Sequence, residues 1–320
     1  HAPLRAVKGG RELVLRLERY LVDLRVLVQQ RLALHAGLFS QRQEGDVGGV
    51  SAPHPLAVAA VQVAFVAEHG RAHQAEAEWL MNNNKPRQAA AACLRSLDAF
   101  KKYTATDKTN ASVFNQMGLC AEIAGQFFKA ETYYTLAMDS DTQTGVPEAY
   151  RNAAILYEEK LARPTDARIM YEKYLARIPE GPEAGIIHIK LAQLYNDAKL
   201  HGPALEHLAK IEDYADNLPA DFRTGAYLQA AIALEAQNRI MEALHAYREG
   251  AKNGSAFPEI HRRYGMFLAR HFDDLPREAV RQLTLYLEKV PGSPFRFEVK
   301  GQIETLRMKI QAGLNTNESQ

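Results

Sequence analysis

The 320 residues carry 39 Lys and Arg against 38 Asp and Glu, a formal net charge of +1, which argues against a surface that binds nucleic acid through its phosphates. With 47% apolar and 24% charged residues, the composition excludes a wholly disordered chain. Two cysteines cannot form a disulfide framework, and the longest mostly apolar stretch, Pro55 to Ala67, is too short for a membrane-spanning helix.

The N-terminal part, residues 1–74, differs in composition from the rest of the chain. It contains no Ile, Asn or Thr, and it has a net charge of +3 against −2 for residues 75–320. Within it, Arg11 to Leu34 is expected to form a helix, and Leu56 to Glu68 either a strand or a helix. The segment is interpreted as a linker-like extension or a wrong-frame read joined to the chain; a genuine N-terminal region is the alternative. Because the chain starts at His1, the compartment stays open, with the cytoplasm as the default and the periplasm as the alternative.

The second part contains an internal repeat. An alanine is followed four residues later by Tyr or Leu five times, with spacings of 37, 37, 39 and 36 residues: Ala130/Tyr134, Ala167/Tyr171, Ala204/Leu208, Ala243/Tyr247 and Ala279/Leu283. A small residue precedes each alanine by 12 to 14 residues: Gly118, Ala154, Ala192, Ala231 and Gly265. Each unit is predicted to be two helices of about 13 residues, whose backbones approach closely at the small residues and whose apolar faces are buried only by stacking of units. Gly125, Pro164, Gly202 with Pro203, Asn238 and Pro276 mark the predicted turns.

These columns resemble the tetratricopeptide repeat family over about residues 75–312, best in Phe114, Gly118, Ala130, Tyr134 and Ala137. The resemblance implies an all-α, right-handed superhelix of helix pairs. A degenerate unit is expected at Ala75 to Lys102, with Trp79 on its first helix and Ala90 and Leu94 on its second. A capping helix is expected at Phe297 to Ala312, followed by a polar tail at 313–320. The units are longer than the family's usual 34 residues, so looser turns are expected.

Motifs of catalysis are not found in the sequence, and neither a metal nor a cofactor is predicted. His188, His201 and His207 cluster in one unit, but none stands four residues from another, so they are interpreted as structural. Cys93 and Cys120 are expected near each other as two small buried residues; a disulfide is the less favoured alternative.

In the tetratricopeptide family the first helices line a concave face that binds a peptide or a partner helix. The positions of this chain that match that face are Asn115, Leu119, Arg151, Asn152, Ile189, Lys190, Gln193, Gln229, Arg262 and Arg263. A carboxylate clamp of the type that binds chaperone C-termini is not expected, because only Asn152 and Lys190 fit its pattern.

The resemblance therefore favours a non-catalytic scaffold that binds a protein or peptide partner, without nucleic acid. The alternatives are an assembly component of a cell-envelope or secretion complex and, more remotely, a regulatory domain separated from an enzyme or sensor. The sequence leaves the partner and the oligomeric state open.

Overall fold

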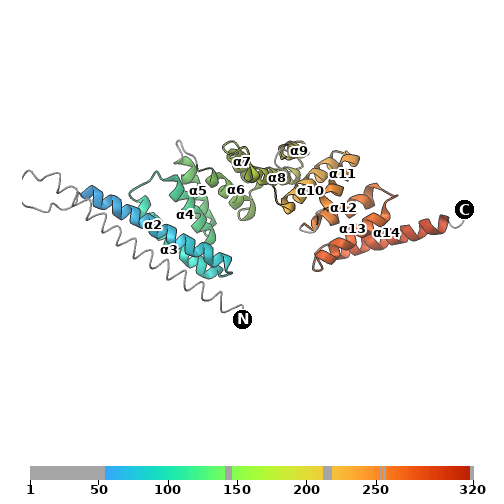
Figure 1. Ribbon diagram of the computed structural model, residues 1–320, viewed down its shortest axis with the longest axis horizontal. Helices are drawn as coiled ribbons and strands as arrows, with labels where there is room; N and C mark the ends of the chain where they lie inside the picture. Colours follow the sequence, from blue (N-terminus) through green and yellow to red (C-terminus); the bar gives the residue numbers. More distant parts are fainter. Residues whose placement is uncertain (1–54, 141–145, 212–217, 253, 255–256, 318–320) are drawn as a thin grey trace, which may run out of the picture. The chain divides into compact units, whose positions relative to one another are not determined.

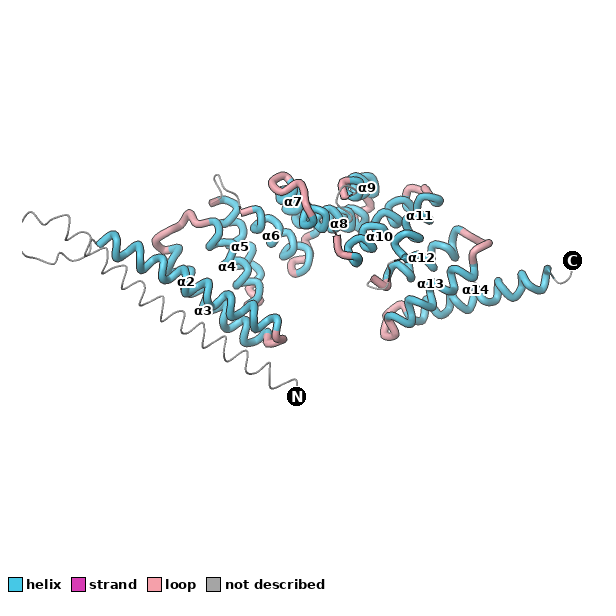
Figure 2. The backbone as a smooth tube through the Cα atoms, viewed as in Figure 1, coloured by secondary structure: helices cyan, strands magenta, loops and turns pink. Residues whose placement is uncertain are grey.

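The computed structural model describes residues 55–140, 146–211, 218–252, 254 and 257–317, with side chains described between residues 66 and 312. Within these ranges every regular element is an α-helix, and the rest is loop and turn (Figure 2). The helix predicted for Arg11 to Leu34 lies outside the described residues. The chain divides into two compact units, residues 1–177 and 178–320.

The helices of the first unit pack as consecutive pairs (Figure 1). In chain order they are α2 (Pro55–Asn82), α3 (Pro86–Thr104), α4 (Ala111–Ile123), α5 (Phe127–Asp139), α6 (Pro147–Glu159) and α7 (Pro164–Leu175). The pairs are α2 with α3, α4 with α5 and α6 with α7, and α3 and α5 each also pack on the pair that follows. Proline stands at the start of α3, α6 and α7, where its missing N–H has no intrahelical partner to lose.

The second unit continues the pattern with three pairs and one further helix. These are α8 (Pro182–Asp197), α9 (His201–Ala209), α10 (Ala220–Ala236), α11 (Ile240–Lys252), α12 (Glu259–His271), α13 (Pro276–Lys289) and α14 (Arg296–Asn317). The last helix packs on α13 and α12. It occupies the place of the predicted capping helix and extends to Asn317, into the residues predicted as a polar tail.

The small residues allow the close packing of each helix pair. The alanines that begin the second helices, Ala130, Ala167, Ala204, Ala243 and Ala279, are all fully buried. A Cβ atom built on Gly118 would lie 2.3 Å from the ring of Tyr134, and one on Gly265 would lie 2.6 Å from Cγ of Leu283. Since carbon atoms in contact normally stay about 3.5–4.0 Å apart, the ring and the leucine occupy the space that a side chain would need. The predicted repeat register of the five full units is confirmed.

A residue with left-handed backbone conformation ends the first helix of most pairs. Asn84, Gly125, Ala162, Lys199 and Asn238 have φ between 52° and 74°, and each stands five residues before the buried alanine of its second helix. The turn of the third full unit was predicted at Gly202 and Pro203. It lies instead around Lys199, because α9 begins at His201 and takes Pro203 into its first turn.

The degenerate first pair is shifted by one residue from the prediction. Leu94 is 43% exposed, whereas Ala89 and Cys93 are fully buried, so these two stand where the other units have alanine and Tyr or Leu. The left-handed Asn84, five residues before Ala89, fixes this register. Its first helix, α2, runs from Pro55 through position 74 without a break, so the change in composition falls inside one helix.

A hydrogen bond between the two helices recurs in three pairs. Tyr134, Tyr171 and Tyr247 each donate their phenol O–H to a glutamate near the end of the first helix, at 3.1, 2.9 and 3.1 Å: Glu122, Glu158 and Glu235. Burial raises the pKa of each tyrosine, and the neighbouring carboxylate raises it further, so the phenols remain donors. Where Leu208 and Leu283 replace tyrosine, apolar packing alone fills the position.

Candidate functional site

Three successive first helices of the second unit, α8, α10 and α12, line one open hollow of about 630 Å³. Its walls include Gln193 on α8, Gln229 on α10 and Arg263 on α12, one residue from each of three repeat units. A second hollow of about 540 Å³ shares Glu235, Arg263 and Arg270 with the first and extends to α14. We call the two together the groove.

Side-chain amides join α8 to α10 at the floor of the groove. Asn196 donates its Nδ2 to the backbone oxygen of Gln229 at 2.9 Å and to its Oε1 at 3.1 Å. The Oδ1 of Asn196 lies 3.0 Å from Nδ1 of His201, at the start of α9. Asn196 is buried, so these bonds fix the spacing of the two helices and the orientation of the Gln229 amide.

A charge network joins α10 to α12. Glu235 forms an ion pair with Arg270, lies 3.3 Å from Nε2 of His271 and accepts the Tyr247 hydrogen bond. Glu259 accepts from Nε of Arg263 at 3.2 Å. Because the glutamates are already paired with arginine, the groove does not carry a strong electrostatic potential of one sign. It presents oriented side-chain amides and exposed edges of guanidinium groups.

Arg262 has a different role from Arg263. It is only 9% exposed, it forms an ion pair with Glu259, and its guanidinium lies 4.1 Å from the centre of the Phe295 ring. A cation held by both a carboxylate and an aromatic face mainly stabilises the fold and has little capacity left to bind a partner. Arg263 is exposed and lines both hollows.

In the first unit, the predicted residues of α4 and α6 meet one another. Asn152 donates its Nδ2 to Oδ1 of Asn115 at 3.0 Å, and both side chains are buried. Leu119 and Arg151 are half-buried on the same two helices. The two asparagines therefore bind one helix to the next, and the sequence did not predict this pairing.

The predicted placement of Ile189 is corrected by its packing. Its side chain is 7% exposed and lies in a core cluster with Ile211 and Leu218, at the connection from α9 to α10. An apolar side chain at this depth stabilises the helix pair and is not a wall of the groove. Lys190, its neighbour on α8, is half-buried and also lies outside the set of groove-lining residues.

The buried His188 and the half-buried His207 form a pair that the sequence spacing did not predict. Their Nδ1 atoms lie 2.9 Å apart, and the ring of Tyr195 stacks on His207 at 5.4 Å between centroids. Burial lowers the pKa of each imidazole to about 4, and the charge of Lys210 adds to the shift. Among the described residues, no group of three or more His, Cys, Asp or Glu could hold a metal ion. His188 stands four residues before Ala192, the place that Phe114 and Tyr150 hold in their units, which indicates that His188 is buried but does not indicate its partner.

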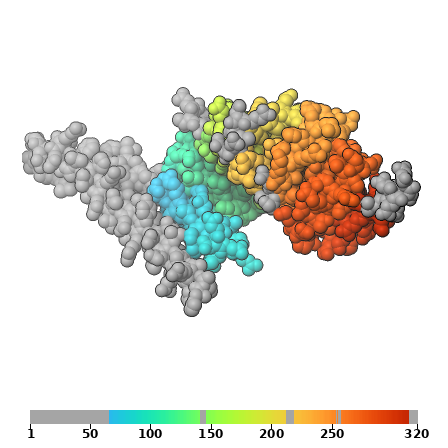
Figure 3. Space-filling model, turned by 45° about the vertical axis from the view of Figure 1, so that its right-hand side comes forward, coloured from blue at the N-terminus to red at the C-terminus, as the bar shows by residue number. Residues whose placement is uncertain are grey.

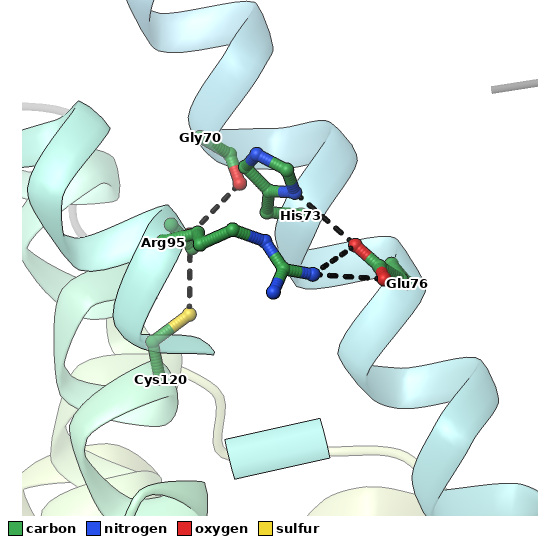
Figure 4. A network of polar contacts seen from close by, with 6 residues as sticks. Gly70, His73, Glu76, Arg95 and Cys120 are labelled. Carbon is green, nitrogen blue, oxygen red and sulfur yellow. Dashed lines mark hydrogen bonds and ion pairs between the residues drawn. The ribbon is translucent and has the colours of Figure 1, made fainter. Parts of the chain in front are cut away.

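Cys93 and Cys120 are close together, fully buried and free. The thiol-to-thiol hydrogen bond and burial raise the pKa of Cys93, which keeps it protonated. Cys120 donates to Oγ of Ser96 at 3.4 Å, and Ser96 donates to the backbone oxygen of Gly70 at 2.8 Å (Figure 4). This chain of bonds joins α2, α3 and α4, so the interpretation as small buried interface residues is confirmed and the disulfide is not formed.

No protein-family model and no curated protein matches the chain. Solved structures match it at low identity. The pilF protein of Pseudomonas aeruginosa is 16% identical, with 76% of this chain and 99% of that chain covered and a TM-score of 0.54. Acl4, an assembly chaperone of RpL4, is 13% identical over 78% and 99%, with a TM-score of 0.54. PilW, a type IV pilus biogenesis factor, is 14% identical over 74% and 97%, with a TM-score of 0.51.

These likenesses concern the fold, and they agree with the helix pairs, the buried small residues and the register described above. The described part of the chain is an all-α array with the tetratricopeptide-repeat fold. None of the helices in that part combines the length and the apolar character that crossing a bilayer requires.

Proposed function

We propose that this protein is a non-catalytic interaction scaffold that binds an extended peptide segment of a partner protein in the groove of α8, α10 and α12. The observation that carries the proposal is that Gln193, Gln229 and Arg263 come from three successive repeat units and line one continuous hollow. An extended peptide presents a backbone N–H and a C=O at regular intervals. A row of amide and guanidinium groups on successive helices supplies partners for both.

Apolar side chains between these polar groups give the groove a second means of recognition. Ile232 on α10, which is half-buried, lines the first hollow, and the half-buried Met266 on α12 lines the second. Specific peptide sites combine apolar pockets with a few oriented polar groups, and this groove has both.

The charges of the groove favour a partner segment of mixed or low charge. Four acidic and four basic side chains line it: Asp197, Glu235, Glu259 and Glu298, with Lys199, Arg262, Arg263 and Arg270. A strongly acidic tail would meet as many repulsive as attractive groups. This supports the expectation that the site is not a clamp for chaperone C-termini.

A displayed peptide library tests the proposal before any partner is identified. Peptides are selected on the full chain and then measured against a groove variant, Gln193→Ala/Gln229→Ala/Arg263→Ala. The matched control, Glu206→Ala/Met241→Ala/Arg277→Ala, removes exposed side chains from the second helices α9, α11 and α13 of the same three units.

We expect selected peptides to lose at least about tenfold in affinity on the groove variant, because several hydrogen bonds of about 0.5–1.5 kcal/mol each are removed. The control variant should bind as the wild type does. Equal binding by both variants would contradict the groove and move recognition to another surface.

A second candidate role is assembly of a cell-envelope or secretion complex, and it is favoured by the likeness of the fold to PilW, a type IV pilus biogenesis factor. Both roles use the same groove and differ in the partner. Cell fractionation of the tagged protein from its native host separates them, since enrichment with envelope fractions supports the second role and its absence from them supports the first.

A further inference from the structure

The hydrogen bonds at the floor of the groove fix the direction of the Asn196 side chain. Its Nδ2 lies 2.9 Å from the backbone oxygen of Gln229, and a backbone oxygen can only accept a hydrogen bond. The atom of Asn196 that faces this oxygen is therefore the amino group. Asn196 is buried, so turning its amide over would bring two oxygen atoms together with no water between them.

The direction of Asn196 determines that of the Gln229 side chain. The same amino group lies 3.1 Å from Oε1 of Gln229. If the Gln229 amide were turned over, two amino groups, both of them donors, would face each other. Oε1 therefore points to Asn196, and Nε2 points away from it. His201 holds the other end of this chain of bonds, because its Nδ1 lies 3.0 Å from Oδ1 of Asn196 and must carry the proton.

The amino group of Gln229 is left as a donor of fixed direction in the wall of the first hollow. Gln229 is half-buried there, and among the described residues nothing accepts a hydrogen bond from its Nε2. Helices α10 to α13, coloured yellow to orange-red in the space-filling view, pack into one continuous surface, so this donor stands on a rigid support (Figure 3). Gln193 lines the same hollow from α8, but it is exposed and no such network holds its amide.

We propose that Gln229 is the specificity-determining hydrogen-bond donor of the groove. Its Nε2 donates to an amide carbonyl oxygen of the bound peptide, from the backbone or from an Asn or Gln side chain, and Asn196 and His201 are positioning residues. A carboxylate fits this place less well, because Asp197 and Glu235 line the same hollow. The inference rests on the peptide function proposed above and adds which group of the peptide the groove recognises.

Gln229→Glu tests the donor in the full chain, with peptides selected from the library. The substitution keeps an oxygen toward Asn196 and replaces the donor by an acceptor. Gln193→Glu is the matched control, because it makes the same change of charge in the same hollow. We expect Gln229→Glu to weaken binding by about tenfold or more, since two oxygen atoms then face each other, and Gln193→Glu by about threefold or less.

Modified peptides identify the acceptor. One set carries a thioamide, a weaker acceptor, at each backbone position in turn, and a second set carries alanine in place of each Asn, Gln, Asp or Glu. The acceptor is the group whose replacement weakens binding to the wild type and has no further effect on Gln229→Glu. A backbone or side-chain amide in this role supports the proposal, and an Asp or Glu carboxylate contradicts it.

Nuclear magnetic resonance of the side-chain amides tests the positioning role of Asn196 in the full chain without a peptide. The two signals are assigned by their loss in Gln229→Glu and Asn196→Asp. We expect the amino protons of Asn196 to exchange slowly with solvent, and those of Gln229 to exchange quickly until a peptide binds. In Asn196→Asp the carboxylate can only accept, so Gln229 should turn over, its amino protons should become slow, and peptide affinity should fall about tenfold. A purely structural role of Asn196 would lower the melting temperature without slowing the Gln229 signal.

Two results overturn this inference alone. One is slow exchange of the Gln229 amino protons in the free wild type. The other is equal affinity of Gln229→Glu and Gln193→Glu for peptides that require the groove. Peptides that bind the groove variant Gln193→Ala/Gln229→Ala/Arg263→Ala as tightly as the wild type would overturn the peptide function as well.

Discussion

Alanine substitutions at Gly265 and Gly301 test the repeat register most sharply. Gly301 stands 36 residues after Gly265, a spacing typical of the column of small residues, and the two substitutions should change stability with opposite sign. At position 265 a Cβ atom would lie 2.6 and 2.8 Å from Cγ and Cδ2 of Leu283 and 3.1 Å from the backbone oxygen of Ala279. Leu283 is fully buried and has no room to turn away, and the Ala279 backbone belongs to a helix that would have to move. At position 301 the added methyl group meets nothing.

The expected magnitudes follow from two opposing terms. Overpacking of a core costs about 1–3 kcal/mol, while alanine in place of glycine inside a helix stabilises it by about 1 kcal/mol. The contacts of 2.6, 2.8 and 3.1 Å at position 265 place its overpacking cost in the upper part of that range, at about 2–3 kcal/mol, so Gly265→Ala should lower the free energy of unfolding by about 1–2 kcal/mol net, and Gly301→Ala should raise it by up to about 1 kcal/mol.

Urea unfolding followed by circular dichroism compares both variants with the wild type. If the dependence of the free energy of unfolding on urea concentration has the same slope in all three proteins, a shift of the midpoint reports a change in stability. Both positions lie in the second unit, so they report on the same cooperative region. A Gly265→Ala variant that is as stable as the wild type, or that shifts in the same direction as Gly301→Ala, would refute the assigned register.

Individual contacts give three further expectations. Ala162→Gly should raise the free energy of unfolding by about 1 kcal/mol, measured as a higher melting temperature, because Ala162 has a φ of 52°, where a Cβ atom is strained. An unchanged or lower melting temperature would contradict this strain. Tyr171→Phe should cost about 1.5 kcal/mol in urea unfolding, because it removes the 2.9 Å hydrogen bond to the Glu158 carboxylate; a neutral effect would mean that this bond is replaced by water. Free imidazoles titrate near about pH 6.5 whereas the pKa of both His188 and His207 is lowered to about 4, so the unfolded state binds more protons in this window and stability should fall as the pH drops through it. The loss is on the order of 3 kcal/mol for one imidazole, and His188→Leu/His207→Leu should not show it in urea midpoints measured at about pH 7 and about pH 4.5.

The sequence predicted the contacts that every repeat unit makes in the same way. Gly118 against Tyr134 is an example, because five copies of one column reveal a small residue opposite a large one even when each copy alone is weak. The degenerate pair was shifted by one residue because Ala89 and Ala90 are equally small. The left-handed conformation of Asn84 and the burial of Cys93 in place of Leu94 distinguish them, and sequence spacing shows neither.

Contacts made once in the chain were harder to predict. The His188 and His207 pair joins α8 to α9 through side chains 19 residues apart, and no periodic pattern links those positions. Ile189 was expected on the groove because it matches a family position. Ile211, soon after α9, and Leu218, just before α10, cover it, and contacts made by residues outside the helices are not encoded in a helical period.

For the candidate site, the sequence grouped Gln193, Gln229 and Arg263 on one side of successive first helices, and in the structure these three line one hollow, since the helical period determines which side of a helix they occupy. It did not predict which charged groups neutralise one another. The pairing of Glu235 with Arg270 depends on the distance between α10 and α12, and the pairing of Glu259 with Arg262, three residues apart on α12, depends on their side-chain rotamers.

Binding of a peptide by the first helices of the second unit is the central claim, and hydrogen–deuterium exchange of the full chain tests it most directly. Exchange is measured with and without a peptide selected from the library, at saturating concentration. We expect slower exchange at the exposed ends and side of α8, α10 and α12, and unchanged exchange in α9, α11 and α13. Protection that appears in the second helices, or in the first unit alone, would contradict the claim.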